Sequence, residues 1–260
     1  SLRLHPDLAQ LIRQQVWLVD RVFRTDPRVH ETFLEILNHP GAVGRILRRM
    51  HELDLLGKFL PEFGRLTCLV QHEFYHQYTV DEHTLVCLEK LDGLWEETWP
   101  DYRRYHEVFE EIERPSTLYL ALLLHDSGKG IESDHHEREG ARVAEHVADR
   151  IGLDEAAADS LRLIIRHHLT MVQVAQRRDL EDPQVIEQFA EEMETEENLS
   201  LLMLHTLADS LGTSDDLWNG FKDTSQWSLF WKTRALFREG PVAVRAEEEE
   251  RAEIETEVTK

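Results

Sequence analysis

The chain has 260 residues, of which 41% are hydrophobic and 31% are charged, the proportions of an ordinary globular protein. Its longest uninterrupted apolar run, residues 118–124, is too short to span a bilayer, and its first ten residues lack the pattern of a secretory signal, so we expect a cytoplasmic protein with no membrane partner. Fifty-one acidic and 29 basic residues give a formal charge of −22, which argues against nucleic acid as a partner.

Apolar residues recur at three- and four-residue spacing along almost the whole chain, and no run alternates as a strand would. The sequence therefore predicts an all-α protein of about ten or more helices, interrupted at proline and glycine clusters. Cys68 and Cys87 lack the spacing of a thiolate zinc site, and we expect both to be reduced and half-buried. We expect a helical lead-in over residues 1–70, a main helical domain over 71–240 and an acidic tail over 241–260.

Two helix starts can be identified from capping patterns. Asp26 is a capping residue followed by Pro27, which suits the first turn of a helix. The segment TVDE at residues 79–82 has the Thr-x-x-Glu form of a capping box. In the helix that begins there, His83 stands four residues before Cys87 on an apolar face, so we expect its imidazole to point inward.

The apolar run at residues 118–124 ends in the pair His125 and Asp126. Such a pair alone is more often surface decoration at a helix end than a pair of ligands. Asp209, however, comes after leucines at helical spacing and is also expected to point inward, and an unpaired buried carboxylate is costly. We therefore predict that His83, His125, Asp126 and Asp209 bind a divalent metal, which could be Mn²⁺, Fe²⁺, Co²⁺, Ni²⁺, Zn²⁺ or Mg²⁺.

Further histidines lie close to this set in sequence. His136 lies just beyond the glycine-containing turn, and His167 and His168 close an apolar segment. These side chains could bind a second metal beside the first, or could hydrogen-bond a substrate phosphate with one metal bound, and both alternatives stay open. We expect His135 and His205 to be incidental, because a histidine on a helix face can be satisfied by a backbone or carboxylate partner.

Basic side chains complete the candidate site. Lys129, in the turn HDSGKG, could contact a phosphate oxygen or protonate a leaving group, although it could also be an exposed loop lysine. Arg177 and Arg178 could bind substrate, but with Asp179 next to them they could equally form a structural salt bridge. We assign catalytic roles to Asp126, Lys129 and His136, and substrate binding to Lys129, His168, Arg166 and Arg177.

The C-terminal part of the chain carries three tryptophans, Trp218, Trp227 and Trp231. They could form a homodimer contact, or they could cap the core, which is the commoner outcome. The glutamate-rich segment after residue 240 predicts a solvated helix extension or a frayed tail.

The order of His83, the pair His125 and Asp126, and Asp209 in an all-helical chain resembles the HD-domain phosphohydrolase superfamily. Longer stretches are similar to the bifunctional uridylyltransferase/uridylyl-removing enzymes that modify nitrogen-regulatory PII proteins. The similar stretches are HPGAVGRILRRMHELDLLGKFLPEF, VQHEFYHQYTVDEHTL, LLLHDSGKG and RHHLTMVQVAQRRDLEDPQVIEQFA. The resemblance covers about residues 1–240.

This resemblance implies an HD-domain helical bundle with additional flanking helices. It also implies a hydrolase that uses metal-activated water to release UMP from a uridylylated tyrosine of PII. Its metal-binding positions match His83, His125, Asp126 and Asp209, and accompanying positions match Lys129, His136, His167 and His168. We find no Gly-Ser motif with a paired-aspartate strand and no βαββαβ pattern, so we expect either the central domain of such an enzyme, apart from its nucleotidyltransferase and ACT domains, or a stand-alone relative.

Two other functions are compatible with the same ligands. One is hydrolysis of a free nucleotide or a cyclic dinucleotide. The other is a non-catalytic, metal-bound module that docks PII or senses a signal. Lys129 and the additional histidines weigh against the second, because a structural metal site needs neither open positions nor spare acid-base groups.

Overall fold

The structure is a computed structural model that describes residues 4–70, 78–96, 102–131, 135–214 and 217–240. Within these ranges the chain forms fifteen α-helices, two short 3-10 helices and no strand. The prediction of an all-α fold is therefore confirmed. The acidic tail at 241–260 lies outside the described residues.

The helices fall into three groups along the chain. The first group contains α1 (Pro6–Gln15), η1 (Val16–Leu18), α2 (Arg21–Arg24), α3 (Pro27–Leu37), α4 (Val43–Glu52), α5 (Leu55–Phe59) and α6 (Pro61–Gly64). The second contains α7 (Val80–Trp95), α8 (Arg103–Glu110), α9 (Pro115–Leu124), η3 (Ser127–Gly130), α10 (His136–Ile151) and α11 (Glu155–His167). The third contains α12 (Thr170–Arg177), α13 (Pro183–Met193), α14 (Glu196–Thr213) and α15 (Gly220–Glu239).

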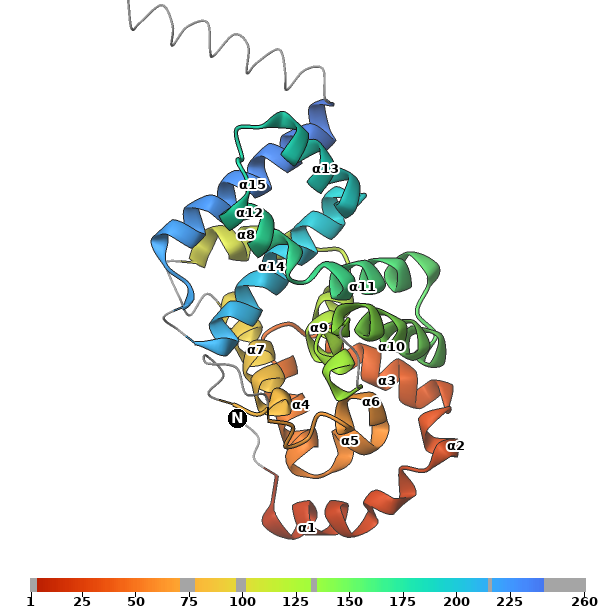
Figure 1. Ribbon diagram of the computed structural model, residues 1–260. Helices are drawn as coiled ribbons and strands as arrows, with labels where there is room; N and C mark the ends of the chain where they lie inside the picture. The colour runs from red at the N-terminus through yellow and green to blue at the C-terminus, as the bar shows by residue number, and fades with distance from the viewer. Residues whose placement is uncertain (1–3, 71–77, 97–101, 132–134, 215–216, 241–260) are drawn as a thin grey trace, which may run out of the picture.

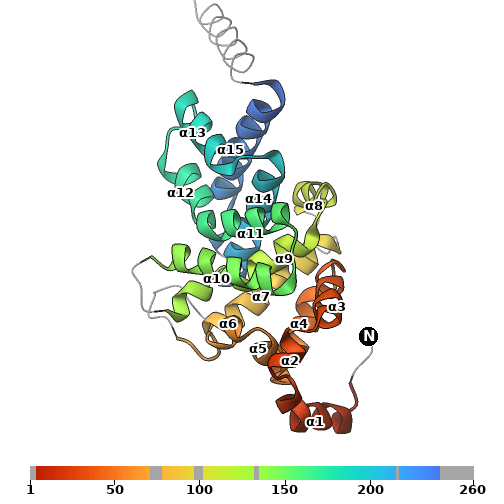
Figure 2. The same cartoon turned by 90° about the vertical axis from the view of Figure 1, so that its right-hand side faces the viewer.

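These groups occupy successive levels of the molecule. Figures 1 and 2 both show α1, α2 and α5 at one end, α7, α9, α10 and α11 in the middle with α3 beside them, and α12, α13 and α15 at the other end. The first group is packed on the second, since α3 lies against α9 and α4 against α7. The residue boundaries of the three predicted parts stay predictions.

Helix α9 is the centre of this arrangement. From Thr117 to Leu124 every residue is buried, because α3, α6, α7, α10, α11 and α14 all pack around it. A helix that is apolar on all sides has no solvent face, which explains why its sequence shows no amphipathic stripe. The residues at its C-terminal end, His125 and Asp126, are therefore placed in the interior of the molecule, where both are buried.

The two predicted helix starts differ in how they are capped. Asp26 caps α3 as expected, with its carboxylate accepting a hydrogen bond from the backbone N–H of Arg28 at 2.9 Å. Thr79 is the residue before α7, but its side chain makes no capping hydrogen bond. The predicted capping box therefore gives the correct helix start, whereas the reciprocal hydrogen bonds of such a box are not formed.

The folded structure bears on three local expectations. Trp218 and Trp227 are buried and only Trp231 is half exposed, so two of the tryptophans belong to the core rather than to a contact surface. The cysteines are not alike, because Cys68 is exposed and Cys87 is fully buried. Among the described residues, no helix combines the length and the apolar character needed to cross a membrane.

Candidate metal centre

His125 and Asp126 emerge directly from the C-terminal end of the buried helix α9. The Nδ1 atom of His125 donates a hydrogen bond to the carbonyl oxygen of Leu122 at 2.8 Å, which leaves Nε2 pointing away from the helix. That Nε2 lies 3.3 Å from Oδ2 of Asp126 and 3.6 Å from Oδ1 of Asp209. A backbone hydrogen bond on one ring nitrogen is the usual way in which proteins orient a metal-binding histidine.

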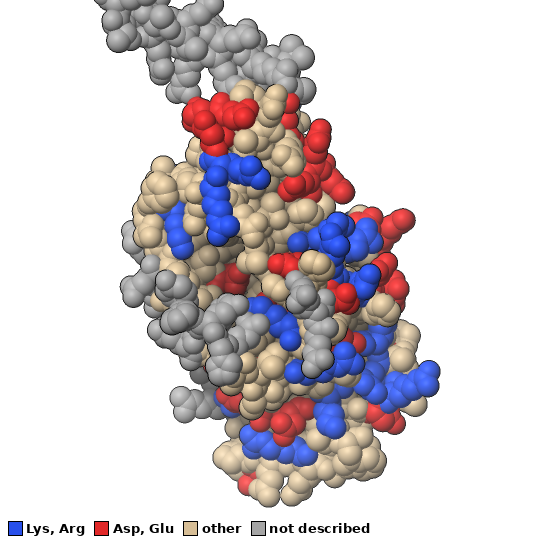
Figure 3. Space-filling model, in the orientation of Figure 1, with Lys and Arg blue, Asp and Glu red and all other residues tan. Residues whose placement is uncertain are grey.

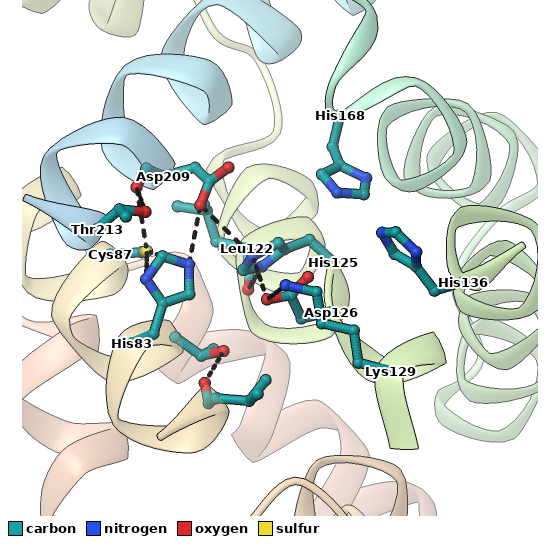
Figure 4. A network of polar contacts seen from close by, with 12 residues as sticks. His83, Cys87, Leu122, His125, Asp126, Lys129, His136, His168, Asp209 and Thr213 are labelled. Carbon is teal, nitrogen blue, oxygen red and sulfur yellow. Dashed lines mark hydrogen bonds and ion pairs between the residues drawn. The ribbon is translucent and has the colours of Figure 1, made fainter. Parts of the chain in front are cut away.

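His83 and Asp209 reach the same point from α7 and α14, which pack side by side. His83 Nε2 and Asp209 Oδ1 are 2.9 Å apart, and the His83 and His125 ring centroids are 5.5 Å apart (Figure 4). The close approach of the two helices depends on Gly212, where a β-carbon would overlap the sulfur of Cys87. The helix packing therefore sets the distance between the histidine and the carboxylate.

The donor set suits a divalent cation. Ligand atoms of His83, His125 and Asp126 all lie within 4.8 Å of one another, as do those of His83, Cys87 and Asp209. Two imidazoles and two carboxylates offer the mixed nitrogen and oxygen ligands that Mn²⁺, Fe²⁺, Co²⁺, Ni²⁺ and Zn²⁺ accept. The presence of Cys87 differs from the sequence-based expectation, which gave neither cysteine a place at a metal.

The electrostatics of the site favour a bound positive charge. Burial raises the pKa of Asp126, but His125 beside it outweighs burial and holds the pKa well below its usual range. Burial has the same effect on Asp209, and His83 and then His125 hold its pKa far below the usual value. Both carboxylates are therefore ionised at ordinary pH and can balance a divalent cation.

Lys129 and His136 lie on the side of this cluster away from His83 (Figure 4). The Nζ atom of Lys129 donates to Oδ2 of Asp126 at 2.9 Å, so the lysine is paired with the site and is not a free loop side chain. Gly128 allows the turn to lie against the start of α10, because a β-carbon there would overlap the carbonyl oxygen of His136. This contact brings His136 to the edge of the site, where its ring centroid is 6.1 Å from the ring centroid of His168.

His168 lies deeper than His136. It is 2% exposed, its Nδ1 donates to the carbonyl oxygen of Ile165 at 2.7 Å, and its ring centroid is 5.6 Å from that of His125. Burial lowers the pKa of His168, so its imidazole is neutral at ordinary pH. A neutral imidazole keeps a lone pair for a metal or for a proton.

His205 is the residue whose place the sequence did not predict. Its ring is fully buried, with centroids 5.3 Å from His125 and 6.1 Å from His168. Neither ring nitrogen has a hydrogen-bond partner among the described residues, which is contrary to the expectation that a backbone or carboxylate group would satisfy it. Helical spacing showed that His205 points inward, but only the packing of α14 against α9 and α11 shows which side chains it meets.

His167 and the arginines lie outside the cluster. His167 Nδ1 contacts the Thr170 hydroxyl at 3.3 Å and lies 3.8 Å from a Glu192 carboxylate oxygen. With Arg177 and Arg178 it lines a groove of about 480 Å³ between α12 and α13. The structure therefore separates His167 from His168, and the predicted second-metal role of His167 has no geometric support.

The contacts of the arginines bear on the salt-bridge alternative, whereas substrate binding by these side chains stays a prediction. Arg166 is exposed near the C-terminal end of α11. No ion pair joins Arg177 or Arg178 to Asp179 or to any other described residue. Asp179 instead accepts a hydrogen bond from the backbone N–H of Glu181 at 3.0 Å. The salt-bridge alternative is therefore absent from the described structure, and both arginine side chains stay available.

The fold and the site together define an all-helical protein with a buried histidine-aspartate centre. A family model described as HD domain matches residues 80–213, and one described as uridylyltransferase GlnD third domain matches residues 2–59. The chain belongs to the HD domain family. HD domains bind divalent metals, and membership of this family supports a metal-dependent phosphohydrolase.

Two relatives are similar over most of the chain. A protein of Methylococcus capsulatus is 40% identical over 232 residues, which cover 89% of this chain and 26% of that protein. A protein of Ruegeria pomeroyi is 36% identical over 248 residues, which cover 95% of this chain and 27% of that protein. Both are named bifunctional uridylyltransferase/uridylyl-removing enzyme. The chain thus spans about a quarter of the length of these curated relatives.

Proposed function

We propose that the chain carries the uridylyl-removing activity named in its relatives: hydrolysis of the phosphodiester that links UMP to a tyrosine of a PII protein. The observation that carries this proposal is the convergence of His83, His125, Asp126 and Asp209 beside Lys129, in a chain similar to uridylyl-removing enzymes over most of its length. Water supplies the new oxygen on phosphorus as the bond to the tyrosyl oxygen breaks, so the products are UMP and PII with an unmodified tyrosine hydroxyl.

Each side chain has a place in this reaction. We assign His83, His125, Asp126 and Asp209 to the divalent cation, which when bound would polarise the phosphate and activate the attacking water. Lys129, held at the site by Asp126, would neutralise a phosphate oxygen as negative charge develops. His136, at the edge of the site, would hold or deliver a proton at the leaving tyrosyl oxygen.

The substrate is held by groups around the centre. His168 presents a neutral imidazole from the end of α11, and Arg177 lines the adjacent groove without an ion pair to another described residue. These two groups, with Lys129, would contact the uridylyl phosphate and the surrounding protein surface of the substrate. Arg166 is exposed on the neighbouring helix turn and would act at longer range.

The test is release of UMP from uridylylated PII, measured as the mass of the intact PII protein. We expect loss of the UMP mass in the presence of Mn²⁺, no loss after chelation, and no loss with Asp126→Ala. Asp126→Ala with full activity and full metal content would contradict the assigned site. Metal binding without UMP release, together with hydrolysis of a free nucleotide or a cyclic dinucleotide, would replace the PII substrate by that nucleotide.

A further inference from the structure

His205 is a buried imidazole that nothing in the described protein satisfies. It is fully buried, and both Nδ1 and Nε2 are without a hydrogen-bond partner among the described residues. Leaving buried polar atoms unpaired costs free energy of folding, and an apolar residue at this position of α14 would avoid the cost. A side chain that is unfavourable for the folded protein alone is a candidate for a role with a ligand.

The neighbours of His205 are themselves candidate metal ligands. The rings of His125, His168 and His205 form a triangle, with centroid distances of 5.3, 5.6 and 6.1 Å. Asp209 stands one helical turn after His205 on α14. The three imidazoles therefore meet next to the buried carboxylate of Asp126 and the half-buried carboxylate of Asp209, which supply the negative charge that a group of metal-binding histidines lacks.

His168 is oriented in the same way as His125. In each case Nδ1 donates to the carbonyl oxygen three residues earlier, Ile165 for His168 and Leu122 for His125, and Nε2 is directed away from the helix. A histidine held in this way by a backbone carbonyl is the form that commonly binds a metal. His168 and His205 thus offer two nitrogen donors next to His125.

We propose that His205 is a ligand of a second divalent cation, which His168 and His205 hold between α11 and α14 and which Asp126 balances. This inference rests on the metal centre of the proposed function and adds a residue to it. His205 belongs to neither of the tight ligand groups found among the described residues, so it is assigned to a second ion and not to the ion at His83. Two imidazoles that share one ion through bonds of about 2.0–2.1 Å have ring centroids roughly 5–6 Å apart. The observed separation of His168 and His205 is 6.1 Å.

The proposal changes the ligand set inferred from sequence. Because Nδ1 of His168 is bonded to Ile165, its remaining nitrogen Nε2 binds the second ion in this arrangement, and His168 then meets the substrate phosphate through that ion instead of directly. His167 is replaced by His205, because His167 faces the groove between α12 and α13 while His205 faces His168. His136 lies at the outer edge of the site, with its ring centroid 6.1 Å from that of His168. There its imidazole or a substrate oxygen could complete the coordination of the second ion. Imidazole donors favour a transition-metal ion such as Zn²⁺, Co²⁺ or Mn²⁺ over Mg²⁺ at this second position.

The experiment compares metal stoichiometry and metal-free stability in the same variants. Mn²⁺ and Zn²⁺ are titrated separately into chelator-treated protein by calorimetry, and bound metal is counted after gel filtration. We expect two ions in the parent protein and one in His205→Leu, with the affinity of the second ion weakened at least about tenfold in His205→Asn. His168→Asn should lose the same ion.

Stability without metal separates a ligand from a structural residue. In chelator, His205→Leu should raise Tm by roughly 2–4 °C, because the unpaired buried nitrogens are removed. His30→Leu is the matched control, since His30 is also buried but its Nε2 donates to the carbonyl oxygen of Arg24 at 2.7 Å. This control should lower Tm and leave the metal stoichiometry unchanged.

Each outcome has a distinct consequence. His205→Leu and His205→Asn that both bind two ions with parental affinity would overturn the role of His205. A parent protein that binds a single ion would overturn the second cation while leaving the proposed function intact. A folded parent protein that binds no divalent ion would instead overturn the metal centre on which the proposed function rests.

Discussion

Lys129 is the basic side chain in direct contact with the centre, through its 2.9 Å hydrogen bond to Asp126. Lys129→Met removes that positive charge without removing a proposed ligand, so we expect metal content to be kept. Loss of one preorganised group that stabilises developing charge typically lowers kcat by about 10²–10³-fold, and we expect a loss of this size. Single-turnover UMP release and metal analysis of the same sample measure both effects.

The matched control for this change is Lys58→Met, an exposed lysine on α5. It should leave both kcat and metal content at the parental level. If Lys129→Met kept the parental kcat, Lys129 would be only a counter-ion of Asp126. If Lys129→Met lost the metal, the role of Lys129 would be to hold the metal ligands in place.

The inward direction of the candidate ligands could be predicted from their helical spacing, while their role as metal ligands stays a prediction. His83, His125, Asp126 and Asp209 point inward on three helices, and a buried carboxylate needs a cation. The separation of His167 from His168 could not be predicted in the same way. The two residues are adjacent in sequence, and the end of α11 between them directs one ring to the centre and the other to the groove.

At the scale of helices, the distance between α7 and α14 decides whether His83 meets Asp209. Gly212→Ala would place a β-carbon against the sulfur of Cys87, so α14 must shift or strain. Overpacking of this kind usually costs about 1–3 kcal/mol of unfolding free energy, and the displaced Asp209 should also weaken metal binding. Urea unfolding and metal titration of the same variant measure the two effects.

The double variant Gly212→Ala with Cys87→Ala tests the cause. Removing the sulfur relieves the main overlap, while the remaining neighbours of the added carbon are Cys87 backbone atoms at 3.1 and 3.2 Å. Part of the lost stability and most of the lost metal affinity should therefore return. Independent, additive effects of the two changes would show that this contact does not set the helix spacing.

A second helix contact makes stability depend on pH. Glu62 on α6 accepts two hydrogen bonds from Arg150 on α10, at 2.6 and 2.9 Å, and both side chains are mostly buried. Burial raises the pKa of Glu62, but Arg150 outweighs burial and lowers the pKa below its usual 4.5. Because the folded-state pKa lies below the unfolded one, this stabilisation is present above the unfolded pKa and is lost as pH falls through the folded pKa.

We therefore expect Glu62→Gln to lower the unfolding free energy by about 1–3 kcal/mol at pH 7. The difference from the parent protein should shrink towards zero as the pH falls through the lowered pKa of Glu62, where Glu62 becomes protonated in the parent as well. Urea unfolding at pH 7 and at low pH measures this. Glu107→Gln is the control, since its 3.4 Å pair with Arg103 is exposed and should contribute little at either pH. An equal destabilisation by Glu62→Gln at both pH values would contradict the assignment of this pH dependence to the Glu62 carboxylate.

Helix starts could be predicted where a proline restricts the local backbone structure. Pro27, Pro61, Pro115 and Pro183 each begin a helix, because proline suits the first turn and breaks later ones. Thr79 shows the limit of this reasoning. Its position before α7 could be read from sequence, but whether its hydroxyl makes the capping bond depends on side-chain geometry that the motif does not specify.

Across the whole molecule, a formal charge of −22 constrains how an anionic substrate can approach. Figure 3 shows acidic side chains gathered at the α13 and α15 end of one face, with basic side chains among them and over the middle and lower parts. Local groups of positive charge can therefore attract a phosphate despite the net charge. The composition excluded a general polyanion binder, but it could not show where such groups lie.

The groove between α12 and α13 is such a place, because Arg177 and Arg178 line it and no ion pair with another described residue holds either side chain. His167 is one of the residues that line this groove, and it is adjacent in sequence to His168 of the metal centre. We propose that a protein substrate engaged at the centre also contacts this groove, and that a small phosphodiester bound at the centre does not. We therefore expect Arg177→Glu to raise the KM for uridylylated PII by about tenfold, or ~1.4 kcal/mol, with little change in kcat.

The comparison between substrates distinguishes docking from damage to the centre. Hydrolysis of bis(p-nitrophenyl) phosphate should be the same in Arg177→Glu and in the parent protein, and the KM difference for PII should diminish at high salt as the charges are screened. Arg21→Glu, on α2 at the opposite end of the molecule, makes the same charge change and should alter neither substrate's KM. Equal losses with both substrates would place the effect of Arg177 at the centre itself, and an unchanged KM for PII would remove the groove from the docking surface.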